Sequence, residues 1–375
     1  MKKIIVLASF FVLIGCMLFT MTGCVKDWNF ATLFGGKYVE KNTNVTGDFN
    51  CIDIVSDTLD IKFIPTTDGS CKVVSFGNAK VDYIVNTTDG VLKIELNDSR
   101  KWYEKMFNWG IGTLTVYLPE GAYTSLSVEE DTGNISVPKE FSFDTINIKR
   151  STGDVSLYAS ASGDISIDGS TGHTTVENIS CGSLEIKCST GNVYLRGITA
   201  SADITIDTST GDAVLADIVC ANIDTNGDTG DIAVDNLDAT ASASFTRSTG
   251  DVNINNAKTG GDLNIAVSTG ESTLTNVSCT SFITVGDTGD VLMSKLIATG
   301  KIDIVRSTGD VDFEDCDATE IRIQTSTGNV KGNWLTEKVF IVRSNTGKIS
   351  VPETTSGGKC KIETDTGDIV ISIEK

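Results

Sequence analysis

Residues 146–157 read INIKRSTGDVSL, and a unit of this kind recurs through most of the chain. At its centre is the turn Ser151-Thr152-Gly153-Asp154, whose glycine returns every 19 or 20 residues and always follows a threonine. The thirteen glycines are Gly133, Gly153, Gly172, Gly191, Gly211, Gly230, Gly250, Gly270, Gly289, Gly309, Gly328, Gly347 and Gly367. A repeat at a fixed period of this size indicates a stacked architecture.

Apolar and polar residues alternate on both sides of each turn, which is typical of half-buried strands. Counted from the glycine, positions +2 and +4 are apolar (Val155, Leu157), as are −7 and −5 (Ile165, Ile167), and a third apolar column follows at +7 (Ile179). We therefore predict an all-β protein, a single-chain β-solenoid of about 13 regular coils preceded by irregular β coils. Coils about 4.8 Å apart would form a rod roughly 60 Å long.

Residues 1–24 have the features of an export segment. Lys2 and Lys3 precede an uncharged apolar run over residues 4–21, and the segment ends in Met21-Thr22-Gly23-Cys24. A cysteine directly after glycine resembles a bacterial lipobox, which implies cleavage before Cys24 and a lipid on its sulfur. The alternative is an uncleaved membrane helix, because the run is about long enough to span a bilayer. Both place the remaining chain outside the cytoplasmic membrane.

The chain is acidic, with a formal charge of −20. Loss of Lys2 and Lys3 with the export segment would make it −22. Nucleic acids and anionic lipids attract Lys and Arg, so this charge argues against both as partners. The same charge favours solubility and the binding of divalent cations.

Three regions follow from the pattern. Residues 25–127 are β-rich but outside the strict repeat, and residues 128–375 form the regular solenoid. The insert 97–112 breaks the alternation and contains four aromatic residues, Trp102, Tyr103, Phe107 and Trp109. It is either a cap over an open sheet edge or an exposed aromatic platform for a glycan or protein. The last strand, residues 369–373, is predicted to expose a pairing edge for end-to-end self-association or for another surface protein.

These features together resemble a known family. The lipobox-like start, the irregular β region ending near Leu118-Pro119 and the serial units of the form STGD-[VI]-x-[LIV] are similar to the bacterial "putative adhesin" family, a domain of unknown function with β-strand repeats. The resemblance covers nearly all of residues 40–375. It implies a β-solenoid of the cell envelope and carries no catalytic residues with it.

Position +1 after each glycine forms a column that is largely acidic. Six consecutive coils place an acid there, about 4.8 Å from the next. One reading is that calcium bridges stacked carboxylates; the other is a solvated ladder in which each acid bonds nearby amides, with Arg247 and Arg306 helping. The residues of the calcium hypothesis are Asp212, Asp228, Asp231, Asp251, Glu271, Asp287, Asp290 and Asp310.

Little in the sequence points to catalysis. His173 is the one histidine, which argues against Ser-His-Asp, Cys-His and multi-histidine metal sites, and no glycine-rich phosphate loop occurs. Cys181, Cys220 and Cys279 share position +9 and are expected to be small buried apolar residues. We therefore expect a non-catalytic, adhesin-like binding module without a cofactor other than calcium. A purely structural, self-associating scaffold is the alternative, and a carbohydrate-active β-helix enzyme is less favoured.

Overall fold

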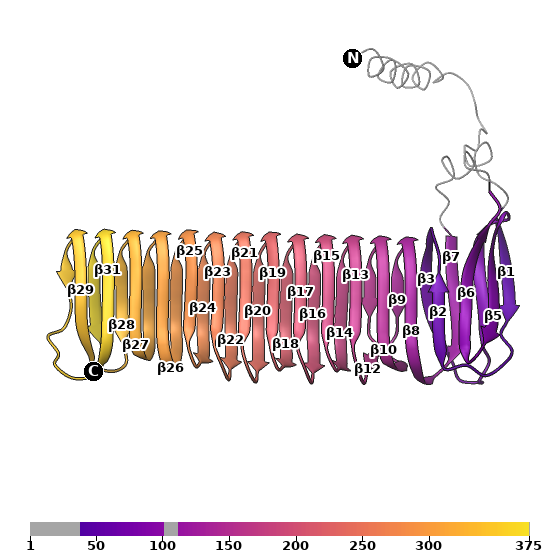
Figure 1. Ribbon diagram of the computed structural model, residues 1–375, viewed down its shortest axis with the longest axis horizontal. Coiled ribbons are helices and arrows are strands. Elements are labelled where there is room, and N and C mark those ends of the chain that lie inside the picture. Colours follow the sequence, from indigo (N-terminus) through magenta and orange to yellow (C-terminus); the bar gives the residue numbers. More distant parts are fainter. Residues whose placement is uncertain (1–37, 101–111, 375) are drawn as a thin grey trace, which may run out of the picture.

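The computed structural model describes residues 38–100 and 112–374, and every regular element in them is a β-strand. The strands stack into one straight rod, with β1 and β5 at one end and β29 at the other (Figure 1). The predicted β-solenoid is confirmed. Within the described part of the chain, no helix has the length and apolar character needed to cross a membrane.

The strands fall into three groups along the rod (Figure 1). The N-terminal group is β1 (Tyr38–Asn44), β2 (Cys51–Val55), β3 (Leu59–Thr66), β4 (Lys72–Asn78), β5 (Val81–Thr88), β6 (Val91–Asp98), β7 (Gly112–Pro119), β8 (Gly121–Thr132) and β9 (Ile135–Val137). The regular group is β10 (Phe141–Thr152), β11 (Val155–Leu157), β12 (Ser160–Ala161), β13 (Ile165–Thr171), β14 (Thr174–Cys181), β15 (Leu184–Thr190), β16 (Val193–Ala200), β17 (Ile204–Thr210), β18 (Ala213–Cys220), β19 (Ile223–Thr229), β20 (Ile232–Ala239), β21 (Ala243–Thr249), β22 (Val252–Thr259), β23 (Leu263–Thr269), β24 (Ser272–Cys279), β25 (Phe282–Thr288), β26 (Val291–Thr308) and β27 (Val311–Thr327). The last group is β28 (Val330–Trp334), β29 (Lys338–Thr346), β30 (Ile349–Ser350), β31 (Gly358–Thr366) and β32 (Ile369–Ile373).

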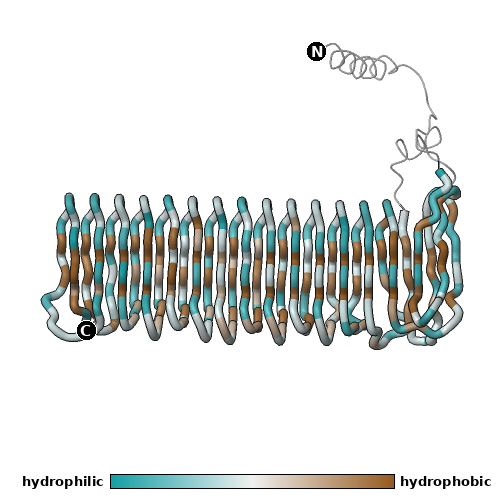
Figure 2. The backbone as a smooth tube through the Cα atoms, in the orientation of Figure 1, coloured by the Kyte–Doolittle hydropathy of each residue, from teal (hydrophilic) through white to brown (hydrophobic). Residues whose placement is uncertain are grey.

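Each regular coil has one strand before the Thr-Gly turn and one after it. Equivalent residues of successive coils pair in parallel, so that Ile165 lies beside Leu184 and Ile167 beside Ile186. The apolar residues at the predicted inward positions are buried and form one continuous core. Hydrophobic and hydrophilic residues accordingly alternate along the strands (Figure 2). The core therefore consists of stacked columns of similar side chains.

A second bend lies six residues after the turn glycine, inside the second strand. Eight consecutive coils place a residue with a positive φ there: Asn178, Gly197, Asp217, Asn236, Asn256, Asn276, Lys295 and Asp315. Asn, Asp and Gly adopt this left-handed conformation most readily. The bend also shifts the alternation by one residue, because positions +2 and +4 point inward before it and +7 and +9 after it. The coil thus gains a corner that is absent from the expectations drawn above.

The N-terminal end is built out of sequence order. β2 pairs with both β6 and β8, and β3 pairs with both β7 and β9, so the β2–β3 layer lies between two layers that come later in the chain. Beyond them the pairing becomes antiparallel: β5 lies on β6, β4 on β7 and β1 on β4. These three strands cover the parallel stack at this end.

The other end is also out of order, and here the sequence-based prediction is wrong. The strand β32 is not the outermost one: it pairs with β28 on one side and, through Ile369 and Val370, with β30 on the other, while β31 lies between β27 and β29. The outermost layer is therefore β29 and β30. The physical reason is that residues 358–373 supply two full strands with buried side chains on both, whereas β30 is only two residues long. The incomplete coil takes the outer position.

The turn glycines approach the neighbouring coil too closely for any side chain. A Cβ added at Gly250 would lie 2.2 Å from the carbonyl oxygen of Gly230, and the same distance is 1.9 Å for Gly270 and Gly250. Eleven of the thirteen turn glycines also have a positive φ between about 125° and 157°. Both features exclude other residues from this position.

We expect Gly250→Ala to lower the free energy of unfolding by about 2–4 kcal/mol, because it adds a backbone clash to an unfavourable φ. Gly121→Ala is the matched control, since Gly121 has a φ of 153° but nothing within 4 Å of its Cβ position. Urea unfolding of both variants measures the difference. Equal destabilisation of the two would show that the close stacking of the turns does not matter.

Candidate functional site

Several residues singled out from the sequence lie outside the described part of the chain. They are Cys24 and the aromatic residues of the insert, Trp102, Tyr103, Phe107 and Trp109. The lipid on Cys24 and the aromatic platform remain predictions.

The acidic column at position +1 is a hydrogen-bonded ladder along one edge of the rod. The main-chain N–H of Asp251 donates to Oδ1 of Asp231 at 2.8 Å, and the N–H of Asp231 donates to Oδ1 of Asp212 at 3.0 Å. His173 belongs to the same ladder, because its Nδ1 accepts the N–H of Asn192 at 3.1 Å. The other main-chain donors in the ladder are Asn134, Asp154, His173, Asp212, Glu271, Asp310, Asn329, Lys348 and Asp368.

The ladder explains how acids can be stacked at this spacing. Hydrogen bonds from amides to ionised carboxylates are strong and place a partial positive charge between successive acids. Glu271 interrupts the series, because its Oε1 accepts the hydroxyl of Thr273 at 2.7 Å instead. Asp228 and Asp287 are exposed beside the same edge. Among the described residues no three His, Cys, Asp or Glu side chains are grouped so that they could hold a metal ion. Calcium binding by stacked carboxylates stays a prediction.

Asp231→Ala should lower the free energy of unfolding by about 1 kcal/mol, because it leaves the N–H of Asp251 without its acceptor. Asp231→Asn keeps an acceptor and relieves charge repulsion, so its stability should equal or exceed that of the wild type. Thermal unfolding measures both. A melting temperature of the wild type that rises with millimolar calcium and falls with EGTA would instead support the calcium reading.

A shallow groove runs along the face between the turn and the second bend. Two hollows of about 390 Å³ and 260 Å³ lie on this face and share Thr273 and Thr275. Their outward side chains are those at positions +3 and +5 of successive coils. The +3 row is Val214, Ala233, Asn253, Thr273, Leu292, Asp312 and Lys331, and the +5 row is Ala216, Asp235, Asn255, Thr275, Ser294 and Glu314.

The side chains that line the middle of the groove are uncharged, whereas charged side chains line its two ends. Between Asn253 and Ser294 the lining consists of amide, hydroxyl and aliphatic side chains. Toward the C-terminal end Asp312 and Glu314 face the same surface as Lys331, and burial raises the pKa of Asp312 above its ordinary value, with Asp310 adding to the effect. By register, Tyr194 continues the +3 row beyond Val214. The groove thus offers a neutral hydrogen-bonding strip that covers three neighbouring strands, β22, β24 and β26, with an aromatic ring farther along the +3 row.

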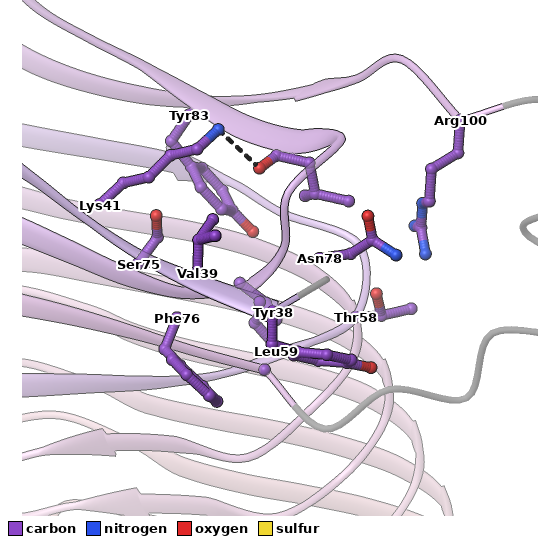
Figure 3. A pocket seen from close by; sticks show the side chains of 13 residues that line it. Tyr38, Val39, Lys41, Thr58, Leu59, Ser75, Phe76, Asn78, Tyr83 and Arg100 are labelled. Carbon is purple, nitrogen blue, oxygen red and sulfur yellow. Dashed lines mark hydrogen bonds between the residues drawn. The ribbon is translucent and has the colours of Figure 1, made fainter. Parts of the chain in front are cut away.

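A second, smaller cavity of about 20 Å³ lies at the N-terminal end among β1, β4 and β5 (Figure 3). Lys41 crosses it, donating to the carbonyl oxygen of Val81 at 3.2 Å and pairing with Asp82 at 3.1 Å. This space holds about one water molecule. It is therefore too small for an organic ligand.

The described cysteines are free thiols. Cys181, Cys220 and Cys279 are buried as predicted, and burial raises their pKa to about 11, 12 and 12. Cys51 and Cys71 are both free and half-buried. A protonated buried thiol is a weak nucleophile, so Cys181, Cys220 and Cys279 are structural.

Sequence reasoning missed the groove residues. The candidate residues named from the sequence are charged or aromatic, whereas the middle of the groove is lined by neutral side chains at positions +3 and +5. The available signal was the shift in alternation between +4 and +7, with Asn or Asp at +6 in most of these coils. That shift predicts a corner, and a surface strip between two corners would have followed from it.

Comparison with known proteins supports the resemblance seen in the sequence. The family model described as Toastrack DUF4097 matches residues 49–259 and 257–375. No curated protein matches the chain. Solved structures similar to it include a "putative adhesin" from Bacteroides fragilis (14% identity, 79% of this chain and 97% of that chain covered, TM-score 0.25) and a "putative lipid binding protein" from Parabacteroides distasonis (14%, 80% and 98%, TM-score 0.23). Another is a "putative cell adhesion protein" from Clostridium sporogenes (8% identity, 90% and 100% covered, TM-score 0.18). Identities and TM-scores this low do not indicate a shared ligand. The family match spans most of the described chain, and the protein belongs to the Toastrack DUF4097 family of β-solenoids.

Proposed function

We propose that this protein is a non-catalytic binding module of the bacterial cell surface, and that its groove binds an extended glycan chain of the envelope or of a host. The observation that supports this most directly is the neutral strip from Asn253 to Ser294. Amide and hydroxyl side chains both donate and accept hydrogen bonds, which suits the hydroxyl groups of a sugar chain. Because the strip runs over three successive coils, it presents hydrogen-bonding side chains at a regular spacing to a polymer.

The position of the chain in the cell rests on the sequence. The export segment and Cys24 would anchor the rod to the outer side of the cytoplasmic membrane, either by a lipid or by an uncleaved helix. The net charge of −20 agrees with a surface that does not bind nucleic acid or anionic lipid. A stiff rod on such an anchor would hold the groove away from the membrane.

Binding without turnover follows from the chemistry of the strip. Hydrolysis or elimination at a sugar needs a pair of acid and base groups beside the scissile bond. The lining between Asn253 and Ser294 has no titratable side chain. The repeat is also not interrupted by an insertion within these coils. The acids of the lining lie outside this strip, Asp235 at one end of the groove and Asp312 and Glu314 at the other.

The test is an array of envelope and host glycans probed with the purified protein. We expect the double variant Asn253→Ala and Thr275→Ala to weaken binding at least tenfold, because it removes two neighbouring hydrogen-bonding groups of the lining worth about 1 kcal/mol each. Asn264→Ala with Thr246→Ala is the matched control on the opposite face of the rod. An array without any bound glycan, or equal loss in both double variants, would contradict the proposal.

The second candidate is a scaffold that self-associates through the outer layer of β29 and β30. Within the described residues β29 pairs on one side only, with β31, and Ile341 and Ile349 are 50% and 45% exposed. An unpaired strand edge with exposed apolar residues is a template for another strand. The opposite end is covered by antiparallel strands, so this is the end at which rods would meet.

Self-association predicts a particle mass that rises with concentration in light scattering. Ile341→Asp should shift the particles toward the monomer, because it places a charge on the pairing edge. Val285→Asp, an equally exposed position in the middle of the rod, should leave the mass unchanged. A strict monomer at high wild-type concentration would exclude the scaffold function.

A further inference from the structure

Three arginines are buried inside the solenoid, directly beneath the turn. Arg150, Arg247 and Arg306 occupy position −3, which points inward, and are 5%, 1% and 2% exposed. Each lies against a glycine at the same position of a neighbouring coil, namely Gly169, Gly227 and Gly286. A Cβ at Gly227 would lie 2.1 Å from Nη1 of Arg247, so the missing side chain makes room for the guanidinium group.

At Arg306 the surroundings satisfy one end of the guanidinium group. Nη1 donates to the carbonyl oxygen of Val267 at 3.0 Å. Nη2 donates to the hydroxyls of Ser272 and Thr284, both at 3.0 Å. Two coils on the N-terminal side of Arg306 therefore provide the acceptors.

Arg247 lies in the same arrangement three coils away, with one substitution that matters. Thr225 takes the place of Thr284 and Thr208 that of Val267, but Ala213 stands where Ser272 stands at the other site. Nε of Arg247 donates to the carbonyl oxygen of Gly230 at 3.1 Å. Nη2 has no partner, and neither does the hydroxyl of Thr208 or of Thr225, although all three atoms are buried.

The positive charge of Arg247 also has no negatively charged group in contact with it among the described residues. In the described part of the chain no carboxylate forms an ion pair with it. Burial lowers its pKa, while Asp212, Asp228 and Asp231 oppose that effect from a distance. A buried cation is costly unless it is paired and hydrogen-bonded.

We propose that a monovalent anion of the size of chloride binds inside the rod beside Nη2 of Arg247. Three hydrogen-bond donors are available to it, the Nη2–H group and the hydroxyls of Thr208 and Thr225. Ala213 lacks the hydroxyl with which Ser272 accepts from Nη2 at the equivalent site. The anion supplies both the missing acceptor and the missing negative charge, whereas a water molecule would supply only the acceptor.

Crystals of the full chain grown in sodium bromide test this directly, because bromide gives an anomalous signal. We expect an anomalous peak within hydrogen-bonding distance of Nη2 of Arg247 and none at Arg306. Density for a water molecule without an anomalous peak would overturn the proposal, and so would a peak of equal height at both arginines.

Two variants give a readout in solution. The wild type should melt about 2–4 °C higher in saturating sodium chloride or bromide than in sodium gluconate of equal ionic strength, because gluconate is too large to enter the site. Ala213→Ser supplies the hydroxyl found at the Arg306 site and should abolish both this difference and the bromide peak. Arg247→Met removes the charge and should abolish the difference as well. A halide effect that persists in Ala213→Ser and in Arg247→Met would place the anion elsewhere and refute the assignment.

Discussion

The structure depends on how closely the turn glycines stack. Along the whole series of thirteen turns, a Cβ on the glycine would lie between 1.9 and 2.3 Å from a carbonyl oxygen of the neighbouring coil. The glycine N–H donates to the threonine carbonyl of the next coil, as from Gly250 to Thr269 at 3.0 Å. This contact fixes the register of each coil on the last, and the buried columns on both sides of the turn follow from it.

The sequence was sufficient to predict what is local to one repeat. Alternation and a glycine after every threonine specify strands, turn and inward columns, so the solenoid, the buried cysteines and the stacked acids could all be predicted. The order of the last layers could not, because the turns at Gly347 and Gly367 look alike and only the shortness of β30 decides which is outermost. The groove was hidden for a different reason: its bend is marked by a column that includes Lys295 as well as Asn and Asp, and so reads as ordinary surface.

The charges of the repeat are arranged in two layers of opposite sign. Acids occupy the outer edge, where main-chain amides donate to them, and arginines occupy the inner side of the same corner, where glycines make room for them. Glu130 is the exception, an acid at the inner position beside the irregular N-terminal layer. It accepts the N–H of Leu59 at 3.1 Å, and burial raises its pKa to about 7. The corner therefore accommodates either a basic or an acidic side chain where backbone groups can reach it.

The layer order at the C-terminal end has a consequence for how the chain folds while it is being synthesised. A solenoid whose coils follow the sequence can grow at its end while the chain is still being made or threaded across a membrane. Here residues 338–350 form the outer layer, which packs on β31 and β32. They cannot take this place until residues 358–373, which are synthesised later, have paired with β27 and β28. The outer layer of β29 and β30 thus forms only after residues 358–373 have been made, and a chain interrupted before that point would lack the strands on which this layer packs and would be open to proteases there.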